Sequence, residues 1–430
     1  VACAAEAGAF DGRSWAAEAC ESTAPAALAV IAALAAHGCL PEDDASVDAC
    51  ADVAYGAARS DSASLRNLGV AALGALARCS AAVARDVVPA LAATLDDDYA
   101  SPAAKVACLA CLGDLCVART SLVEPRARSL CLRLGDADAD VRRHAVVVIA
   151  RLLGRDYLKW RPELVVRFFS CLADAAPANR ALARHALVDV LLPKTPTLFV
   201  NHVVACLRLY TGDRGDAETA DLPRHFGGTA NAARRRAVYR ALLSATPDEG
   251  KVQVSAKLAR EVLAPAADVP SLGPQLRDPE SPAYNAVADA LHLLGGDLEV
   301  LAPSRKAADD DGADDDAPDA AATTRSKTLA AARGKLLGHM SKLHLLEQVL
   351  PILIALKHTL DKLKSPLAAP LVATLKRVLA THGPDVEKVL ATDPHLAREL
   401  KYDLKRSKAP KQAAGAEPAA APRSPLAEAN

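Results

Sequence analysis

The feature that most constrains the fold is a period of about 38 residues in the placing of basic side chains. Arg66, Lys105, Arg142 and Arg180 stand at similar points of four successive helical stretches, 39, 37 and 38 residues apart. Within the third stretch, residues 141–153, apolar side chains recur at helical spacing and the arginines face elsewhere. One such helix cannot bury its apolar stripe alone, so it needs copies of itself on either side. The period therefore predicts a stack of similar helical units.

The turns add an acid-to-base step to this repeat. An acidic residue stands six positions ahead of a basic residue from Asp136 to Arg142 and again from Asp174 to Arg180, and Asp140 is a good N-cap for the following helix. Each turn carboxylate can pair with a base of its own or the neighbouring unit, or the acids can be ordinary solvated caps. Two helices per unit, no strand signal and a period near 38 are typical of HEAT or armadillo repeats. We predict an all-α, HEAT/armadillo-type α-solenoid.

Composition agrees with close helix packing and gives no sign of a cofactor. The chain is 51% hydrophobic but only 3% aromatic, and its net charge of −1 predicts no polyanion partner by itself. The eleven cysteines lie between Cys3 and Cys206, mostly in apolar stretches, which indicates reduced core residues of a cytosolic or nuclear protein. Cys108, Cys111 and Cys116 lack the further ligand pair of a zinc set, so no metal is expected. No apolar run reaches the roughly 18 residues of a membrane span.

Changes of pattern along the chain predict six segments. Two of them are defined by charge: seven Asp lie between Asp309 and Asp319, and residues 325–408 hold sixteen Lys and Arg against seven Asp and Glu. The chain shows no initiator Met, so we expect the C-terminal part of a longer protein. The segments are an Ala-rich incomplete repeat with a helix starting near Pro25 (1–60), the solenoid core (61–210), a helical extension with inserted loops in which Thr246 caps a helix (211–302), an acidic disordered linker (303–324), a basic C-terminal helical block (325–408) and a disordered tail (409–430).

Four stretches carry a family resemblance. LGDADADVRRHAVVVIARLLGRDYLKWR, LVDVLLPKTPTLFVNHVVACL, LEQVLPILIALKHTLDKLKSP and ARELKYDLKRSK, in this order, resemble the C-terminal half of the D-type HEAT subunit of condensin, most closely the condensin II form. The resemblance covers about residues 120–408 and is specific at DYLKWR (156–161), LLPKTP (191–196) and LPILIALK (350–357). Residues 211–324 match least, and residues 1–60 share only the general HEAT pattern.

The resemblance implies a non-catalytic scaffold or regulatory subunit. It would bind the kleisin and SMC ATPases of condensin together with DNA or nucleosomes, possessing no small-molecule substrate and no membrane role, in mitotic chromosome condensation in the nucleus and on the chromosome. No Walker-type GxxxxGK[ST], GxSxG or HExxH motif occurs. The alternative is a generic HEAT-repeat adaptor, such as a transport receptor or a phosphatase-type scaffold. An adaptor predicts regular repeats to the C-terminus, whereas an acidic linker and a basic block follow here.

Three basic sets are candidates for binding DNA or chromatin, and for each the alternative is a solvated face or internal ion pairs. The third set has a further alternative, since the acidic run could fold back onto it. The first set is Arg142, Arg143, Arg151, Arg155, Lys159, Arg161 and Arg167; the second is Arg234, Arg235, Arg236 and Arg240; the third is Lys357, Lys362, Lys364, Lys376, Arg377, Lys401, Lys405 and Arg406.

Two smaller features complete the candidates. Tyr157 and Trp160 could contact a methylated histone lysine through cation–π attraction, or they could pack between adjacent repeats. Ser424, followed by Pro425, is a candidate for proline-directed phosphorylation. No catalytic residue is expected.

Overall fold

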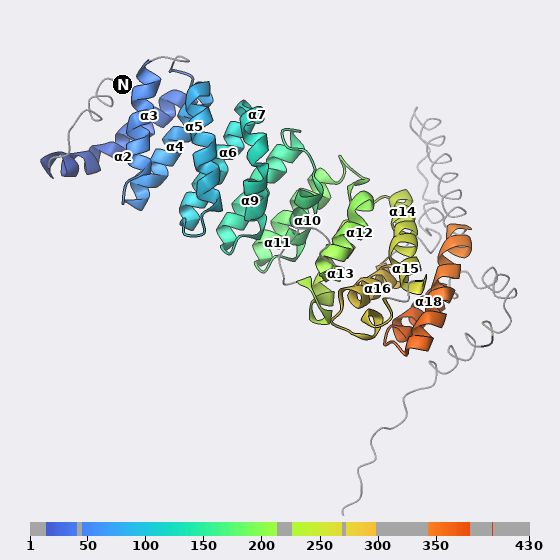
Figure 1. The fold of residues 1–430 in the computed structure, drawn as a ribbon. Coiled ribbons are helices and arrows are strands. Elements are labelled where there is room, and N and C mark those ends of the chain that lie inside the picture. Colours follow the sequence, from blue (N-terminus) through green and yellow to red (C-terminus); the bar gives the residue numbers. More distant parts are fainter. Residues whose placement is uncertain are drawn as a thin grey trace, which may run out of the picture.

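The described part of the chain is a stack of helix pairs (Figure 1). The computed structural model describes residues 14–40, 45–212, 226–268, 272–297, 343–378 and 398. Within these ranges every regular element is helical, and none of the helices combines the length and apolar character that crossing a membrane requires. The predicted all-α, HEAT-type solenoid is confirmed.

Four regular repeats form the centre of the stack. Their helices are α4 (Ala63–Cys79) with α5 (Ala81–Asp96) in repeat 1; α6 (Pro102–Ala118) with α7 (Thr120–Val123), η1 (Glu124–Arg126), α8 (Ala127–Leu132) and η2 (Arg133–Gly135) in repeat 2; α9 (Ala139–Gly154) with α10 (Pro162–Ser170) and η3 (Cys171–Ala173) in repeat 3; α11 (Pro177–Arg184) and η4 (His185–Leu191) with α12 (Leu198–Thr211) in repeat 4. Helices α2 (Ser14–Ala36) and α3 (Ala45–Ala58) precede them.

Two further pairs continue the stack. Their helices are α13 (Ala232–Ser244) with α14 (Asp248–Leu258), η8 (Ala259–Leu263) and α15 (Ala264–Asp268) in repeat 5; α16 (Pro282–His292) and η11 (Leu293–Asp297) with η14 (Leu345–Val349) and α18 (Leu350–Leu363) in repeat 6. The short segments η7 (Thr229–Asn231) and η10 (Gln275–Arg277) lie ahead of α13 and α16, and residues 368–378 form one more helix.

The helices form two layers. The first helices of successive repeats pack against each other, α4 on α6 and α6 on α9, and so do the second helices, α8 on α10 and α10 on α12. Fully buried Leu76, Leu109 and Ile149 fill the space between the layers. A Cβ added at Gly74 would lie 2.5 Å from the Cys111 sulfur, so only glycine allows this close approach of α4 and α6. Gly74 thus sets the spacing of two neighbouring first helices within their layer.

Polar caps start the first helices of repeats 2 and 3 at the predicted period. Ser101 Oγ accepts a hydrogen bond from Ala104 N at 3.3 Å, and Asp138 Oδ1 accepts from Asp140 N at 2.9 Å. The prediction that Asp140 caps α9 is therefore wrong by two residues, because Asp138 holds the exposed amides and Asp140 lies in the first turn.

Two other predicted helix starts are also wrong. The helix near Pro25 begins earlier, at Ser14, and runs through the proline, since one missing N–H interrupts an Ala-rich helix only locally. Thr246 does not cap α14, because its hydroxyl donates to Leu242 O at 2.8 Å and thereby ends α13.

The stack continues on both sides of residues 298–342. Helix α18 packs beside α15, where Thr359 Oγ1 donates to Ala267 O at 2.9 Å, and Thr374 Oγ1 donates to Leu291 O at 3.2 Å, which holds residues 368–378 against α16. Each helix extends one of the two layers. The acidic and basic segments after residue 302 are predicted to interrupt the regular repeats, but the helices of residues 343–378 continue the stack. The six predicted segment boundaries stay predictions.

Candidate chromatin-binding surface

The solenoid has two edges that differ in the turns they carry. The inter-repeat edge holds the turns between successive repeats, at residues 97–101, 136–138 and 174–176, where the first helices begin. The intra-repeat edge holds the turns inside each repeat, at residues 119, 155–161 and 192–197, where the first helices end. Because α9 rises about 1.5 Å per residue, Arg142 and Arg155 stand about 19 Å apart on opposite edges. The residues of the first predicted set are therefore divided between the two edges.

Basic residues of the inter-repeat edge link neighbouring repeats. Lys105 Nζ lies 3.5 Å from Asp136 Oδ2, and both side chains are buried. One repeat further on, Arg142 Nε and Nη2 donate to the Asp174 carboxylate at 2.6 and 2.9 Å. The predicted pairing of turn carboxylates with bases of the neighbouring unit is confirmed at these two rungs. We call this series the inter-repeat ladder.

The ladder also reaches repeat 5, which the sequence analysis missed. Arg235 Nη1 donates to Phe226 O and Gly228 O at 2.6 and 2.7 Å, and Arg235 Nε donates to Asp289 Oδ2 at 2.6 Å. Arg142 makes the same set of contacts, with two carbonyl oxygens of the turn before it and one carboxylate of the next repeat. Arg235 follows Arg180 by 55 residues instead of 38, so the insertion between repeats 4 and 5 hides it from a search for period.

Charge pairing sets the protonation of the central rung. Burial by itself would raise the pKa of Asp174, but hydrogen bonds from Arg142 and from the Ala176 amide outweigh it and lower that pKa below its ordinary value. The same hydrogen bond raises the pKa of Arg142 above its ordinary value. Both groups are therefore charged near neutral pH, and the rung is an ion pair.

The intra-repeat edge exposes its cations. Arg155 and Lys159 are exposed and have no ion pair within the described ranges. Arg151 pairs with Asp114 at 2.9 Å and Arg161 with Glu124 at 3.2 Å, but these side chains stay 38% and 56% exposed. Exposed ion pairs of this kind are weak and exchange readily with other anions. One further exposed base lies on this edge, Lys194, and two lie on the second helix of repeat 2, Arg126 and Arg128; none of the three was predicted from the sequence.

Two predicted contact residues of the first and second sets are buried and cannot reach a phosphate group. Arg167 is 3% exposed, and its Nε lies 3.4 Å from Glu163 Oε1 one turn earlier in α10. Arg235 is fully buried in the ladder. Their prediction as DNA or chromatin contacts is corrected, because Arg167 is buried beside Glu163 of its own helix and Arg235 is buried between residues 226–228 and α16.

The remaining arginines of α13 differ in exposure. Arg236 is partly exposed and lies 3.3 Å from Asp289, whereas Arg240 is exposed. Arg234 donates to Ala173 O at 2.7 Å and lies over the Phe226 ring, 5.3 Å from its centroid. The alternative of internal ion pairs therefore applies to two of the four arginines, since both Arg235 and Arg236 pair with Asp289.

Tyr157 and Trp160 lie at the turn before α10. Both are partly buried and pack against the core, and the Trp160 and Phe168 ring centroids are 6.1 Å apart. This placement agrees with the alternative that the rings pack between repeats. The histone contact stays a prediction.

The cysteines with described burial are mostly core residues. Cys108, Cys116 and Cys171 are buried, and burial raises the pKa of Cys108 and Cys171 to about 12. These thiols are protonated near neutral pH and act as small apolar side chains. The prediction of cysteines in the core is confirmed there, with Cys39 as an exposed exception.

The third basic set falls partly outside the described residues. Lys401, Lys405, Arg406 and Ser424 lie outside them. Lys357 is 3% exposed and its Nζ lies 2.7 Å from Asp361 Oδ2, so its prediction as a surface contact is corrected.

Two family models match the chain in consecutive parts. Residues 103–268 match the non-SMC mitotic condensation complex subunit 1 family, and residues 302–416 match the condensin-2 complex subunit D3-like HEAT repeats. A solved structure of Kap95p with RanGDP aligns over 88% of this chain and 48% of its own, at 16% identity and a TM-score of 0.30. Such a score is below the level at which two chains share an overall arrangement.

Curated relatives match over most of this chain. The condensin-2 complex subunit CAP-D3 of Arabidopsis thaliana is 30% identical over 310 residues, which are 69% of this chain and 23% of the relative. The condensin-2 complex subunit D3 of Mus musculus is 26% identical over 302 residues, or 68% and 19%. The D3-L subunit of Xenopus laevis is 26% identical over 335 residues, or 75% and 22%. The chain thus spans about a fifth of the length of these relatives.

Together the stacked helix pairs and the family matches define the class of protein that this chain is similar to, the non-SMC, HEAT-repeat subunits of condensin. Within this class the chain is similar to condensin-2 subunit D3. The predicted resemblance to the D-type subunit, most like the condensin II form, is confirmed.

Proposed function

We propose that this chain is a scaffold and regulatory part of condensin II that binds the kleisin subunit and chromatin during mitotic chromosome condensation. The observation that carries the proposal is that two condensin family models match in chain order along one continuous stack of repeats. The SMC ATPases would supply the chemical work on other chains. The sites of action would be the nucleus and the chromosome.

The exposed cations of the intra-repeat edge support the chromatin part of the proposal. Arg155, Lys159 and Arg161 lie close together in one turn, and Arg151 lies one helical turn earlier. Arginine and lysine side chains at such positions contact phosphate groups without reading sequence. The ladder, by contrast, gives the rod its shape, and its charges are already paired. A solenoid of this kind acts by gripping partners and has no reaction of its own.

Co-purification tests the assignment directly. The tagged 430-residue chain is expressed in cells and recovered from nuclear extract, and the co-purifying proteins are identified by mass spectrometry. We expect SMC and kleisin subunits in the recovered complex. Recovery of transport cargo or phosphatase subunits without any SMC protein would contradict the proposal and favour the adaptor alternative.

A further inference from the structure

The ladder provides a template for what each rung arginine binds. Arg142 Nη1 donates to Asp136 O and Ala137 O at 2.8 and 2.9 Å, which fixes the guanidinium plane against the turn before its own helix. The other edge of the same guanidinium group then meets the Asp174 carboxylate with two hydrogen bonds. A carboxylate fits this planar fork because its two oxygens match two parallel N–H donors.

Arg180 makes only the first half of this arrangement. Its Nη1 donates to Asp174 O at 2.7 Å and to Ala175 O at 3.0 Å, as at the other rungs. In the part of the chain that the structure describes, no carboxylate meets the other edge of its guanidinium group. The side chain is exposed. An oriented two-donor edge is therefore turned to the surface at the junction of repeats 4 and 5.

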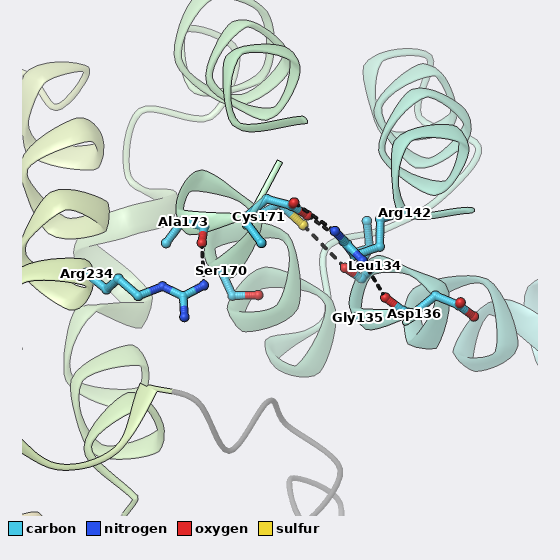
Figure 2. Close-up of a pocket in the computed structure, with 10 residues that line it drawn as sticks. Leu134, Gly135, Asp136, Arg142, Ser170, Cys171, Ala173 and Arg234 are labelled. Carbon is cyan, nitrogen blue, oxygen red and sulfur yellow. Dashed lines mark hydrogen bonds and ion pairs between the residues drawn. The ribbon is translucent and has the colours of Figure 1, made fainter. Parts of the chain in front are cut away.

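A second anchored arginine adjoins this rung. Arg234 Nη2 donates to Ala173 O, so Arg234 and Arg180 together occupy the carbonyl oxygens of three consecutive residues of one turn. Figure 2 shows Arg234 reaching toward this turn from one side of a pocket, with Arg142 on the other side. The pocket has a volume of about 230 Å³ and is open to the surface. It gives a ligand room beside the Arg234 guanidinium group.

We propose that Arg180 and Arg234 bind the carboxylate groups of an acidic peptide segment of a partner protein. The other arginine rungs show that a carboxylate fits the slot, and the backbone carbonyls hold both guanidinium groups in place before the ligand arrives, which reduces the entropy lost on binding. Asp136 and Asp174 border the pocket. Both are already paired, Asp136 with Lys105 and Asp174 with Arg142. The group that meets the fork at the other arginine rungs is a side-chain carboxylate, which a peptide supplies and a nucleic-acid backbone does not.

A peptide-binding measurement tests this site without reference to condensin. The 430-residue chain is titrated into a fluorescein-labelled 12-residue peptide in which Asp and Glu alternate with Gly and Ser, and fluorescence anisotropy is recorded. Because charge-assisted hydrogen bonds are lost, we expect Arg180→Gln and Arg234→Gln each to weaken binding about tenfold. Arg180→Lys keeps the charge but loses the fork, so it should lie between Arg180→Gln and the unchanged chain. The same peptide with Asn and Gln in place of the acids should not bind.

Arg184→Gln is the matched control, because Arg184 is exposed on the same helix and the charge change is identical. If Arg184→Gln weakened peptide binding as much as Arg180→Gln, the loss of affinity would be explained by net charge alone, and the proposal would be overturned. A 20-base-pair DNA duplex is added as a competitor. If it displaces the peptide, and if Arg180→Gln weakens duplex binding as much as peptide binding, the site would be assigned to nucleic acid instead. Tighter peptide binding after replacing Asp213, Asp216, Glu218 and Asp221 by amides would assign it to the chain's own loop. Circular dichroism confirms that each variant is folded.

Discussion

The two edges of the solenoid carry similar residue types and use them differently. On the inter-repeat edge, Lys105 and Arg142 are paired with carboxylates of the next turn, and all four side chains are at most 15% exposed. On the intra-repeat edge, Arg155 and Lys159 are exposed and have no ion pair among the described residues. The number of charges on an edge therefore says little about its role. What matters is whether a carboxylate of the neighbouring repeat reaches each base.

The two edges therefore have different tasks, since paired bases fix the arrangement of the repeats and exposed bases can bind an external anion. A buried ion pair between repeats fixes the rotation from one repeat to the next, because breaking it leaves an uncompensated charge in a desolvated turn. An exposed lysine or arginine contributes little to stability and stays available to an external anion. Substitutions on the inter-repeat edge should accordingly change the stability of the fold, and substitutions on the intra-repeat edge should change binding.

Removing the most buried rung should have the largest effect. Asp289→Ala leaves Arg235 without its carboxylate where both side chains are fully buried, and we expect a loss of about 3–5 kcal/mol in the local stability of α13 and α16. Hydrogen exchange of the backbone amides of these helices measures it. Asp268→Ala, at an exposed position of α15, should change it by less than about 0.5 kcal/mol. Equal hydrogen-exchange rates in the two variants would contradict the claim that the ladder stabilises the solenoid.

The aromatic packing of the intra-repeat edge comes next. Trp160→Ala removes a partly buried ring that packs near Phe168, so we expect a loss of about 2–3 kcal/mol in the free energy of unfolding, measured by circular dichroism in urea. Trp160→Phe keeps a ring and should cost less. Unchanged stability of Trp160→Ala, together with loss of binding to a trimethyl-lysine peptide, would instead support the predicted histone contact.

A central ladder rung should matter less than the fully buried one. Arg142→Gln leaves the buried Asp174 carboxylate without its two-pronged partner, and we expect a loss of about 1–3 kcal/mol in the free energy of unfolding. The adjacent Arg143, whose side chain is 55% exposed, provides the control, since Arg143→Gln should change that free energy by less than about 0.5 kcal/mol. If the two variants were equally stable in urea titrations, the rung would be an ordinary solvated cap.

The same rung predicts a pH dependence. The pKa of Asp174 is lower in the folded chain than in the unfolded one, so its ionised form adds stability that is complete above the unfolded pKa near 3.8. This contribution is lost as pH falls through the folded pKa. The stability difference between the unchanged chain and Asp174→Asn should thus be constant near neutral pH and shrink below about pH 4. A difference that grows on acidification would reverse the sign and contradict the ion pair.

The smallest stability effect belongs to the exposed cations. Arg155→Gln and Lys159→Gln together should change the free energy of unfolding by less than about 0.5 kcal/mol, because neither side chain has an ion pair among the described residues. Urea unfolding checks this. A loss above about 1 kcal/mol would show that the intra-repeat edge also uses its bases structurally.

The sequence predicts the regular part of this architecture well for a physical reason. A stacking unit must repeat its turns and the bases beside them at one spacing, so Arg66, Lys105, Arg142 and Arg180 each lie four residues after the N-cap residue of a first helix. The period fails only where the chain inserts residues. Arg235 performs the same task one repeat later, but the insertion shifts it out of phase.

The candidate site was harder to predict because a charge pattern does not reveal which way a side chain faces. Arg167 stands in a basic run and is nevertheless buried; Glu163, four residues earlier, is the one local sign of an internal partner. Similarly, the acidic stretch before residue 325 differs in composition from the solenoid, but stacking depends on apolar helix faces, which resume with Leu345 and Leu353. A change in composition therefore locates an insertion. Whether the stack continues beyond it is shown by the apolar faces of the helices that follow.

The salt dependence of DNA binding tests the central distinction between the two edges most directly. Affinity for a short duplex is measured by fluorescence anisotropy at several salt concentrations for the unchanged chain and two charge-matched variants. Replacing Arg155, Lys159 and Arg161 by Gln should reduce the slope of log affinity against log salt by about 2–3, since each lost phosphate contact removes about 0.9. Replacing Arg66, Arg143 and Arg184, exposed away from that edge, should reduce it by less than about 1. Equal slopes for the two variants, or a larger reduction in the second, would contradict the account.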